Sequence, residues 1–384
     1  MLVGMKWVLA IVSVLMIGAA GFWWYGQVIV EPAGSPQYLP SEQASTTSEM
    51  IETTVPPVEV VAENLSIPWE VLFLPDGELL VTERPGTLLL LKQGLEIPVP
   101  GIEHIGEGGL LGAVLHPNFT ENNFLYLYQT TATPEGLRNR INRYTLKGEE
   151  LLFESTIVAD LPGARYHDGG RIALGPDELL YVTVGDAGDA PAAQNPDNRA
   201  GSILRYTLEG DIPEDNPFEN AVYSYGHRNP EGLAWDGMGK LWSSEHGRSG
   251  VRSGFDEINA IAKGGNYGWP DSEGDVVADG TIAPERHSTA DTTWAPGGLA
   301  YHNGSLYMPG LRGATLYEAV VDNGSIVAWH EHLMDEYGRL RTVVVGADGL
   351  LYVTTSNRDG RGAPPSRADD RIIRIDPAQL ERDS

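Results

Sequence analysis

The sequence predicts an all-β fold, a six-bladed β-propeller, because one turn–strand unit recurs along the chain and long helical periods are absent. The unit is a polar turn followed by a short apolar strand, and its copies stand at 74–84, 116–130, 175–186, 235–247, 303–310 and 346–356. Asp, Asn and Gly in the turns accept tight-turn dihedrals, and Leu, Val, Tyr, Trp and Thr suit a half-buried strand. The spacing of the turns matches one four-stranded blade per repeat. A pair of β-sandwiches is the alternative, but it would not require six copies of one unit.

An uncharged apolar segment precedes the repeats and predicts a membrane anchor in residues 1–30. No charged residue occurs between Trp7 and Val30, and Lys6 stands before this run. At about 1.5 Å per residue, an α-helix of this length would cross a bilayer. Small residues at 18–20 leave a cleaved export signal as the alternative. Either interpretation places the rest of the chain outside the cytoplasm, in the periplasm or at the cell surface.

Residues 31–57 are predicted to form a flexible linker, and residues 58–380 the propeller. The linker segment is rich in Pro, Ser, Thr and Glu, has no Lys or Arg, and lacks a steady apolar period. Such a segment buries too little apolar surface to offset its ordering entropy.

Composition excludes several classes of function. The chain has no cysteine, which excludes disulfide scaffolds, thiol catalysis, iron–sulfur clusters and zinc bound by cysteine. Its 26 Lys and Arg against 53 Asp and Glu give a net charge of −27. An acidic protein of this kind repels nucleic-acid phosphates, so we expect no nucleic-acid partner.

The candidate base lies in a loop between two predicted strands. His167 precedes one strand, and Asp186 ends the strand that follows it. A chain that runs up one strand and returns along the next can bring the carboxylate beneath the imidazole. A carboxylate on one ring nitrogen fixes the tautomer and leaves the other nitrogen as a base. A structural histidine and a turn aspartate are the alternative.

Further candidates also lie where the repeat is interrupted or a predicted strand begins. Arg228 and Asn229 precede Pro230, and this pair can grip a planar polyanion. Arg339 and Arg341 share one face of a strand at a period of two, which suggests an anion between them. Arg228 could instead be a surface arginine bonded to loop carbonyls.

An acidic turn and a glycine-rich turn suggest a metal site. The segments are DEIN at 256–259, which contains Glu257, and NYGWP at 266–270, which contains Tyr267. Carboxylate and backbone carbonyl oxygens are hard ligands that favour Ca²⁺. An ordinary acidic turn is the alternative.

Taken together, these motifs resemble one family over residues 58–376. They are LPDGELLVTER (74–84), GEGGLLGAVLHPNF (106–119), HDGGRIALGPDELLYVTVGDAGD (167–189), IPEDNPF (212–218), YGHRNPEGLAW (225–235), SEHG (244–247), DEIN and NYGWP. In content and order they resemble the soluble quinoprotein sugar dehydrogenases, the glucose/sorbosone dehydrogenase family. That family is a six-bladed propeller, in agreement with the repeat count.

The resemblance implies oxidation of aldose sugars at C1 to lactones, with pyrroloquinoline quinone (PQQ) and Ca²⁺ as cofactors. His167 would be the base and Asp186 the carboxylate that orients it. The cofactor contacts would be Glu107, Arg228, Asn229, Gly310, Arg312, Arg339 and Arg341, and the calcium ligands would be Glu257 and Tyr267. An external electron acceptor, a quinone or a soluble carrier, would complete the cycle. A lactonase-type propeller hydrolase and a non-catalytic cell-surface binding propeller remain the alternatives.

Overall fold

The computed structural model describes residues 34–40, 57–250 and 253–382. The predicted anchor and most of the predicted linker lie outside these residues, so both stay predictions. Among the described residues, no helix has the length and apolar character needed to span a bilayer.

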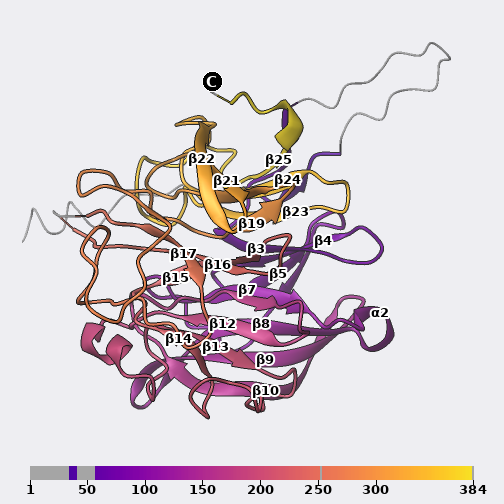
Figure 1. Cartoon of the computed structure of the whole chain (residues 1–384). Coiled ribbons are helices and arrows are strands. Elements are labelled where there is room, and N and C mark those ends of the chain that lie inside the picture. The colour runs from indigo at the N-terminus through magenta and orange to yellow at the C-terminus, as the bar shows by residue number, and fades with distance from the viewer. Residues whose placement is uncertain (1–33, 41–56, 251–252, 383–384) are drawn as a thin grey trace, which may run out of the picture. The chain divides into compact units, whose positions relative to one another are not determined.

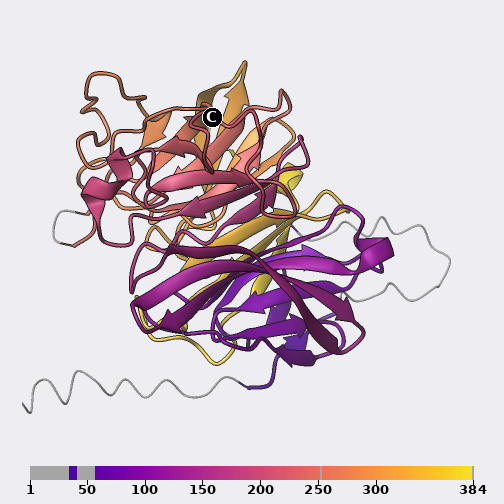
Figure 2. The same ribbon diagram turned by 90° about the horizontal axis from the view of Figure 1, so that it is seen from below.

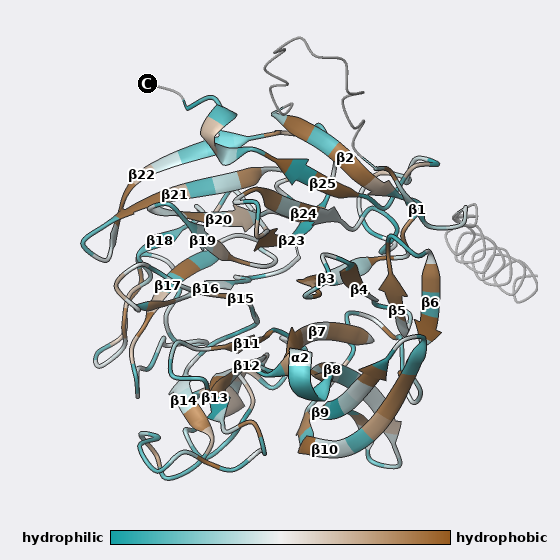
Figure 3. Ribbon diagram, turned by 90° about the vertical axis from the view of Figure 1, so that its right-hand side faces the viewer, coloured by the Kyte–Doolittle hydropathy of each residue, from teal (hydrophilic) through white to brown (hydrophobic). Residues whose placement is uncertain are grey.

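The described chain folds into six antiparallel sheets placed in sequence order around a central axis, so the predicted all-β six-bladed propeller is confirmed (Figures 1 and 3). Blade 1 contains β3 (Pro68–Phe73), β4 (Leu79–Glu83), β5 (Thr87–Leu90) and β6 (Leu95–Pro98). Blade 2 contains β7 (Leu110–Leu115), β8 (Phe124–Thr133), β9 (Gly136–Lys147) and β10 (Glu150–Pro162), with α2 (Phe119–Asn122) between its first two strands. Blade 3 contains β11 (Ile172–Leu174), β12 (Leu180–Val184), β13 (Ser202–Tyr206) and β14 (Val222–Tyr225), with the 3₁₀ helix η1 (Ala190–Gln194) between β12 and β13.

The remaining blades complete the circle. Blade 4 contains β15 (Pro230–Trp235), β16 (Leu241–Glu245), β17 (Glu257–Ile261) and β18 (Arg286–His287). Blade 5 contains β19 (Ala300–His302), β20 (Ser305–Pro309), β21 (Leu316–Asp322) and β22 (Ser325–His332). Blade 6 contains β23 (Leu340–Val345), β24 (Leu351–Thr355) and β25 (Ile372–Ile375), followed by the 3₁₀ helix η2 (Pro377–Gln379).

The two ends of the propeller sequence meet in blade 6. β2 (Val58–Glu63) pairs antiparallel with β25, and β1 (Gln37–Tyr38) pairs with β2. Figure 2 shows the indigo strands of the N-terminal side next to the yellow C-terminal strands. Two residues of the predicted linker therefore belong to a sheet, where Tyr38 packs against an apolar cluster beside blade 1. This closure ties the segment before blade 1 to the last blade by backbone hydrogen bonds.

The repeated turn has a simple local cause. In the first repeat, the Gly77 N–H donates to the carbonyl of Leu74, and Gly77 has φ of 82°. The last repeat has the same arrangement at Gly349, with φ of 77°. Glycine adopts this left-handed conformation without a Cβ penalty. The strands that follow, such as β4 and β24, are buried along their whole length.

A buried arginine links the blades across the axis. Arg171, just before β11, pairs with Glu70 on β3. Its Nε donates to the carbonyl of Glu231 on β15 at 2.8 Å, and its Nη2 donates to Oγ1 of Thr342 on β23 at 3.0 Å. The guanidinium also lies 4.3 Å from the ring centroid of Trp69. One side chain of blade 3 therefore contacts blades 1, 4 and 6.

This arrangement predicts a large loss of stability when the cation is removed. Arg171→Met leaves the Glu70 carboxylate buried without its ion-pair partner, which should lower the free energy of unfolding by about 3–5 kcal/mol. Urea unfolding followed by tryptophan fluorescence measures the change. Arg143→Met is the matched control, because its partner Glu209 has a side chain that is 64% exposed and such pairs contribute less than about 1 kcal/mol. Equal losses in the two variants would contradict a central role for Arg171.

Candidate active site

The candidate residues meet because of strand direction. Each inner strand begins, and each second strand ends, at the same edge of its blade, since the two strands are antiparallel. His167 and Arg228 precede inner strands, whereas Asp186 and Arg312 follow second strands. Segments far apart in the sequence are therefore gathered on one face. Figure 1 shows long connections on the side of the propeller away from α2.

His167 and Asp186 are in direct contact. The imidazole Nδ1 lies 2.6 Å from Oδ1 of Asp186, whose side chain is 2% exposed. The other carboxylate oxygen of Asp186 accepts a hydrogen bond from Nε1 of Trp269 at 2.9 Å, and the Gly188 N–H donates to Oδ1 at 2.8 Å. Burial would raise the pKa of Asp186, but hydrogen bonds and the nearby imidazole hold that pKa below its ordinary value.

Arg228 defines the tautomer of the imidazole. Its Nη2 lies 2.9 Å from Nε2 of His167, and a guanidinium is a donor only. The Nε2 atom therefore accepts, and Nδ1 carries the proton that His167 donates to Asp186. This is the neutral tautomer in which Nε2 is the basic atom.

The backbone of His167 is strained and held from several sides. Its φ is 62°, in the left-handed region that is unfavourable for residues other than glycine. The His167 N–H donates to Oε2 of Glu107 at 2.7 Å, and the Ala187 N–H donates to the His167 carbonyl at 3.3 Å. A Cβ on Gly185 would lie 2.1 Å from that carbonyl, so glycine is required there.

Contacts extend from His167 in two directions across this face, and we call the residues involved the mouth ring. They are His167, Arg228, Ser249, Ser253, Arg312, Leu311, Arg339, Asp359, Arg361 and Glu107. Arg228 donates to Ser249 at 2.9 Å, and Arg312 donates to Ser253 in the same loop at 2.8 Å. In the other direction, the His167 N–H donates to Glu107, which lies 3.1 Å from Arg361. Four guanidinium groups and two carboxylates therefore share the face of the propeller that bears the candidate base.

Arg339 and Arg341 have internal partners. Arg339 donates to Oδ2 of Asp359 at 2.8 Å, and buried Arg341 donates to Oε2 of Glu231 at 2.9 Å. Each arginine thus pairs with a carboxylate of the protein. These carboxylates balance the two positive charges, so an anion between the arginines is not needed. Arg339 reaches the mouth ring, whereas Arg341 contacts Glu231. We call Glu231 and its partners Asn229, Arg341 and His246 the axial group.

Asn229 and Gly310 have local structural contacts. Asn229 is 2% exposed; its amide donates to Oε1 of Glu231 at 3.1 Å, and its Oδ1 accepts from the Gly169 N–H at 2.9 Å. Asn229 thereby connects the loop of His167 to the axial group. At Gly310, a Cβ would lie 2.7 Å from the ring of Tyr317, so close packing requires a glycine.

Glu257 and Tyr267 line one small cavity. It has a volume of about 10 Å³, near what one water-sized species needs, and Glu245 and Glu273 also face it. Burial and the charge of Glu245 raise the pKa of Glu257 to about 8. The Tyr267 hydroxyl is engaged by backbone groups of residues 260 and 262, and its ring stacks on His227. Within the described ranges, no group of three or more His, Asp or Glu side chains is arranged to hold a metal ion.

Sequence reasoning missed several contributors to this face. Arg361 and Asp359 do not belong to the motifs, yet both are in the mouth ring, whereas Arg84 ends the motif LPDGELLVTER but was not singled out as a candidate. Arg84 is buried nearby, and its pKa is lowered to about 10 by burial and by the charge of Arg341. Glu231 was also missed, although it stands inside YGHRNPEGLAW. The available signal was a glutamate within the otherwise uncharged segment Pro230–Trp235.

Comparison with known proteins identifies relatives of this chain. A family model described as glucose/sorbosone dehydrogenase matches residues 65–368. The aldose sugar dehydrogenase YliI of Escherichia coli is 31% identical over 343 residues, which covers 79% of this chain and 91% of the relative.

Solved structures agree with that match. A putative oxidoreductase (glucose dehydrogenase) of Thermus thermophilus is similar with a TM-score of 0.78 and 43% identity, covering 83% of this chain and 98% of the other. The PQQ-bound aldose sugar dehydrogenase of Streptomyces coelicolor is similar with a TM-score of 0.75 and 40% identity, covering 83% and 97%.

Asp168, next to the candidate base, gives this site a testable pH dependence. Burial raises its pKa from 3.8 to about 7. Because the folded state binds this proton more tightly, the aspartate weakens the folded state increasingly as pH rises from about 4 to about 7. Asp168→Asn removes the titration, so its melting temperature relative to the parent protein should increase between pH 5 and pH 8. Calorimetry measures this difference, and Asp211→Asn, at an exposed position, is the control. A difference for Asp168→Asn that does not change with pH would contradict the assignment.

Proposed function

Since the chain belongs to the glucose/sorbosone dehydrogenase family, we propose that it is a PQQ- and calcium-dependent aldose dehydrogenase that converts sugars to lactones. The observation that carries this proposal is the mouth ring, in which an imidazole with a basic Nε2 lies among four guanidinium groups. The PQQ-bound relative from Streptomyces coelicolor supports the choice of cofactor.

The donor set fits a flat cofactor with three carboxylates. Arg312 is exposed, and the side chain of Arg361 is 38% exposed, so both can bind an anion from solvent. The guanidinium of Arg228 can stack on a planar ring, as it already lies 5.4 Å from the ring centroid of Trp269. Arg339 would keep its pair with Asp359 and support this surface. When bound, PQQ would supply the two-electron acceptor for the hydride of the sugar C1 carbon.

The protein's own residues would manage the proton. The C1 hydroxyl of the sugar replaces the Arg228 donor at Nε2 of His167 and transfers its proton there as the C1–H bond breaks. The imidazolium that forms is stabilised by Asp186 through Nδ1, at 2.6 Å. Arg228 would stay near the C1 oxygen, where its charge favours the transition state.

Calcium would occupy the small cavity beside this site. Glu257 provides a carboxylate and Tyr267 a backbone carbonyl, both of which are hard oxygen donors. Glu245 and Glu257 repel one another across the same cavity, and a divalent cation would relieve that repulsion.

The two alternative functions receive less support. A lactonase-type hydrolase needs carboxylate and amide ligands around its metal, whereas guanidinium groups dominate the mouth ring. A non-catalytic binding propeller has no need of a strained histidine held in one tautomer. The acceptor would be an external quinone or soluble carrier, and the predicted anchor would keep the enzyme at the outer side of a membrane.

Reconstitution tests the proposed reaction. Protein mixed with PQQ and Ca²⁺ should oxidise aldoses in a dye-linked assay, and His167→Ala should lower turnover by roughly 10²–10⁴-fold while PQQ still binds. His302→Ala is the control, because His302 ends an inner strand at the opposite face. Correctly folded protein that neither binds PQQ nor oxidises any aldose would refute the assignment. Unchanged turnover in His167→Ala would show that another group is the base.

The proposed calcium site predicts that bound Ca²⁺ stabilises the folded protein. An ion that binds only the folded state at about 100 times its Kd stabilises it by roughly 2.7 kcal/mol. Added Ca²⁺ should therefore raise the melting temperature of the protein, and Glu257→Gln should abolish most of that increase. Glu209→Gln, a charge-matched change on an exposed side chain, should leave the increase intact. An equal calcium response in both variants would place the ion elsewhere.

A further inference from the structure

Glu245 is a buried carboxylate that the proposed proton transfer does not use. It ends β16, the second strand of blade 4, and is 4% exposed. Its Oε1 accepts a hydrogen bond from the Arg228 N–H, and its Oε2 lies 2.8 Å from Nδ1 of His227. The amide of Asn259 donates to the same Oε2 at 3.4 Å. Because a carboxylate only accepts, donors from two neighbouring segments converge on Glu245.

The need for this carboxylate follows from the proline that begins β15. Pro230 faces Glu245 in the ladder between β15 and β16. Proline has no N–H, so it cannot donate to β16 and the regular ladder ends there. The residues before it are held in other ways: the His246 N–H donates to the Asn229 carbonyl at 3.1 Å, and the Arg228 N–H donates to the side chain of Glu245. Glu245 therefore takes the place of a strand partner where the chain reaches the mouth ring.

The backbone of Arg228 connects Glu245 to the groups on both sides of the candidate base. The N–H of Arg228 donates to Glu245, and its carbonyl accepts the Asp186 N–H at 2.8 Å. Asp186 contacts Nδ1 of His167, whereas the Arg228 guanidinium lies at Nε2. One short segment thus sets the spacing between the two groups that hold the imidazole.

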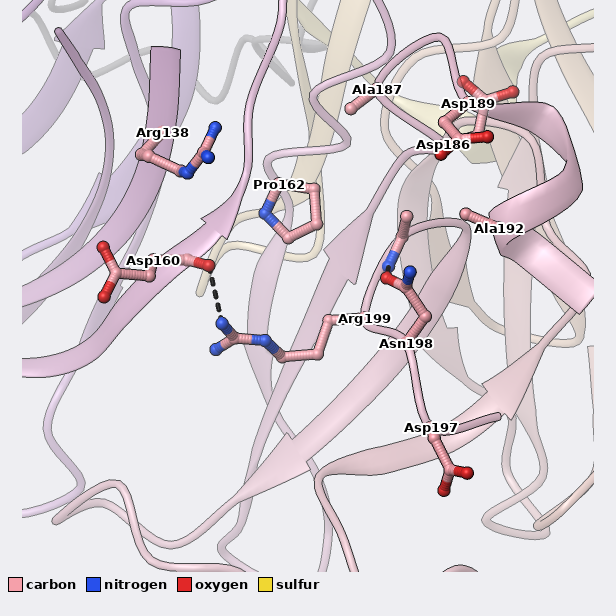
Figure 4. A pocket seen from close by; sticks show the side chains of 11 residues that line it. Arg138, Asp160, Pro162, Asp186, Ala187, Asp189, Ala192, Asp197, Asn198 and Arg199 are labelled. Carbon is pink, nitrogen blue, oxygen red and sulfur yellow. Dashed lines mark hydrogen bonds between the residues drawn. The ribbon is translucent and has the colours of Figure 1, made fainter. Parts of the chain in front are cut away.

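Asp186 borders open space on its other side. Together with Ala187 and Asp189 it lines a pocket of about 380 Å³ between blades 2 and 3 (Figure 4). The position of Asp186 therefore depends on the hydrogen bonds that it forms away from the pocket, among them the bond from its N–H to the Arg228 carbonyl.

We propose that Glu245 is a positioning residue for the base: by holding the Arg228 backbone, it keeps the Arg228 guanidinium at Nε2 and Asp186 at Nδ1 of His167. Charge-assisted hydrogen bonds are short and strong, which suits a buried carboxylate to this task. Within the described part of the chain, Glu245 has no hydrogen bond to the imidazole, so it acts through Arg228. The kinetic consequence of this inference rests on the proposed aldose dehydrogenase reaction, whereas its structural consequence does not.

Histidine NMR tests the structural consequence. The protein is kept free of PQQ and Ca²⁺, because Asn259 also contacts Glu257, the proposed calcium ligand, at 3.1 Å. With ¹⁵N-labelled histidine, the parent protein should show His167 protonated at Nδ1 alone, and His167→Ala assigns that signal by its loss. Glu245→Leu removes the acceptor and should give a mixture of the two tautomers or a rapidly exchanging Nδ1 proton. Glu245→Gln keeps one oxygen for the Arg228 N–H and should restore the parent signal; loss of the signal in this variant as well would overturn the proposed route through Arg228.

Glu318→Leu is the matched control. Glu318 is a fully buried carboxylate of blade 5 that accepts from His332, Ser305 and Arg382, which are outside the mouth ring and the axial group. This variant should lose stability but keep the parent signal of His167, so equal changes in the two Leu variants would attribute the effect to a general loss of structure and overturn the inference. Serine replaces leucine at both positions if either Leu variant does not fold, because water in the vacated space can satisfy the donors without fixing them.

Kinetics tests the consequence for the proposed reaction. With saturating PQQ and Ca²⁺, Glu245→Leu should lower kcat for glucose by roughly 10–100-fold and leave KM within about threefold, since a misplaced base affects the transition state more than substrate binding. Glu318→Leu should keep kcat within about twofold of the parent value. A parent value of kcat in Glu245→Leu, or an equal fall in both variants, would overturn the catalytic consequence.

The two measurements separate failure of the positioning role from failure of the proposed activity. A parent protein that oxidises no aldose, together with a changed His167 signal in Glu245→Leu, would refute the activity and leave the positioning role intact. An unchanged His167 signal in Glu245→Leu would overturn the positioning role whatever the activity.

Discussion

One buried cation at the axis determines how the blades of this propeller meet. Arg171 forms an ion pair with Glu70 and donates to a carbonyl at Glu231 and a hydroxyl at Thr342, so it joins four of the six blades. Burying such a charge is unfavourable unless every donor finds a partner. The contacts therefore fix the inner strands in one arrangement. His167 stands four residues before Arg171, and Arg228 stands three residues before Glu231, so the same contacts place base and guanidinium opposite one another.

The axial group and the mouth ring are two sets of charged side chains that contact one another. Glu231 receives hydrogen bonds from Asn229 and Arg341 and lies 3.2 Å from Nε2 of His246. His246 in turn accepts, through its carbonyl, a hydrogen bond from Arg228 of the mouth ring. Although burial would raise the pKa of Glu231, these cations lower it to about 2. A permanently charged carboxylate inside the propeller thus supports the cationic surface above which we propose that the cofactor binds.

The sequence predicted the architecture and the pairing of His167 with Asp186 for the same reason. Both follow from local patterns, namely strands that alternate with glycine turns and an up-and-back path that returns one strand beside another. The partners of Arg339 and Arg341 could not be predicted in this way. Asp359 lies in a loop 20 residues after Arg339, and Glu231 lies two blades and 110 residues before Arg341. Contacts across the axis depend on which blades face each other, and no periodicity in one strand encodes that. The pocket between β9, β10 and the loop after Asp186 was missed because its walls come from two different blades, and no local pattern encodes how the blades pack together.

The uneven distribution of charge over the protein would affect an anionic cofactor and a neutral sugar differently. The protein has a net charge of −27, yet the mouth ring contains four arginines and two carboxylates, a local excess of two positive charges. An anionic cofactor is repelled by most of the surface and attracted to this one region, and this attraction weakens as salt screens it. A sugar is neutral, so the electrostatic field of the protein has little effect on its binding, which depends on hydrogen bonds and shape. The acidic exterior and the basic mouth ring therefore separate two recognition problems: electrostatics would select the anionic cofactor that we propose, and hydrogen bonds and shape would select the neutral sugar.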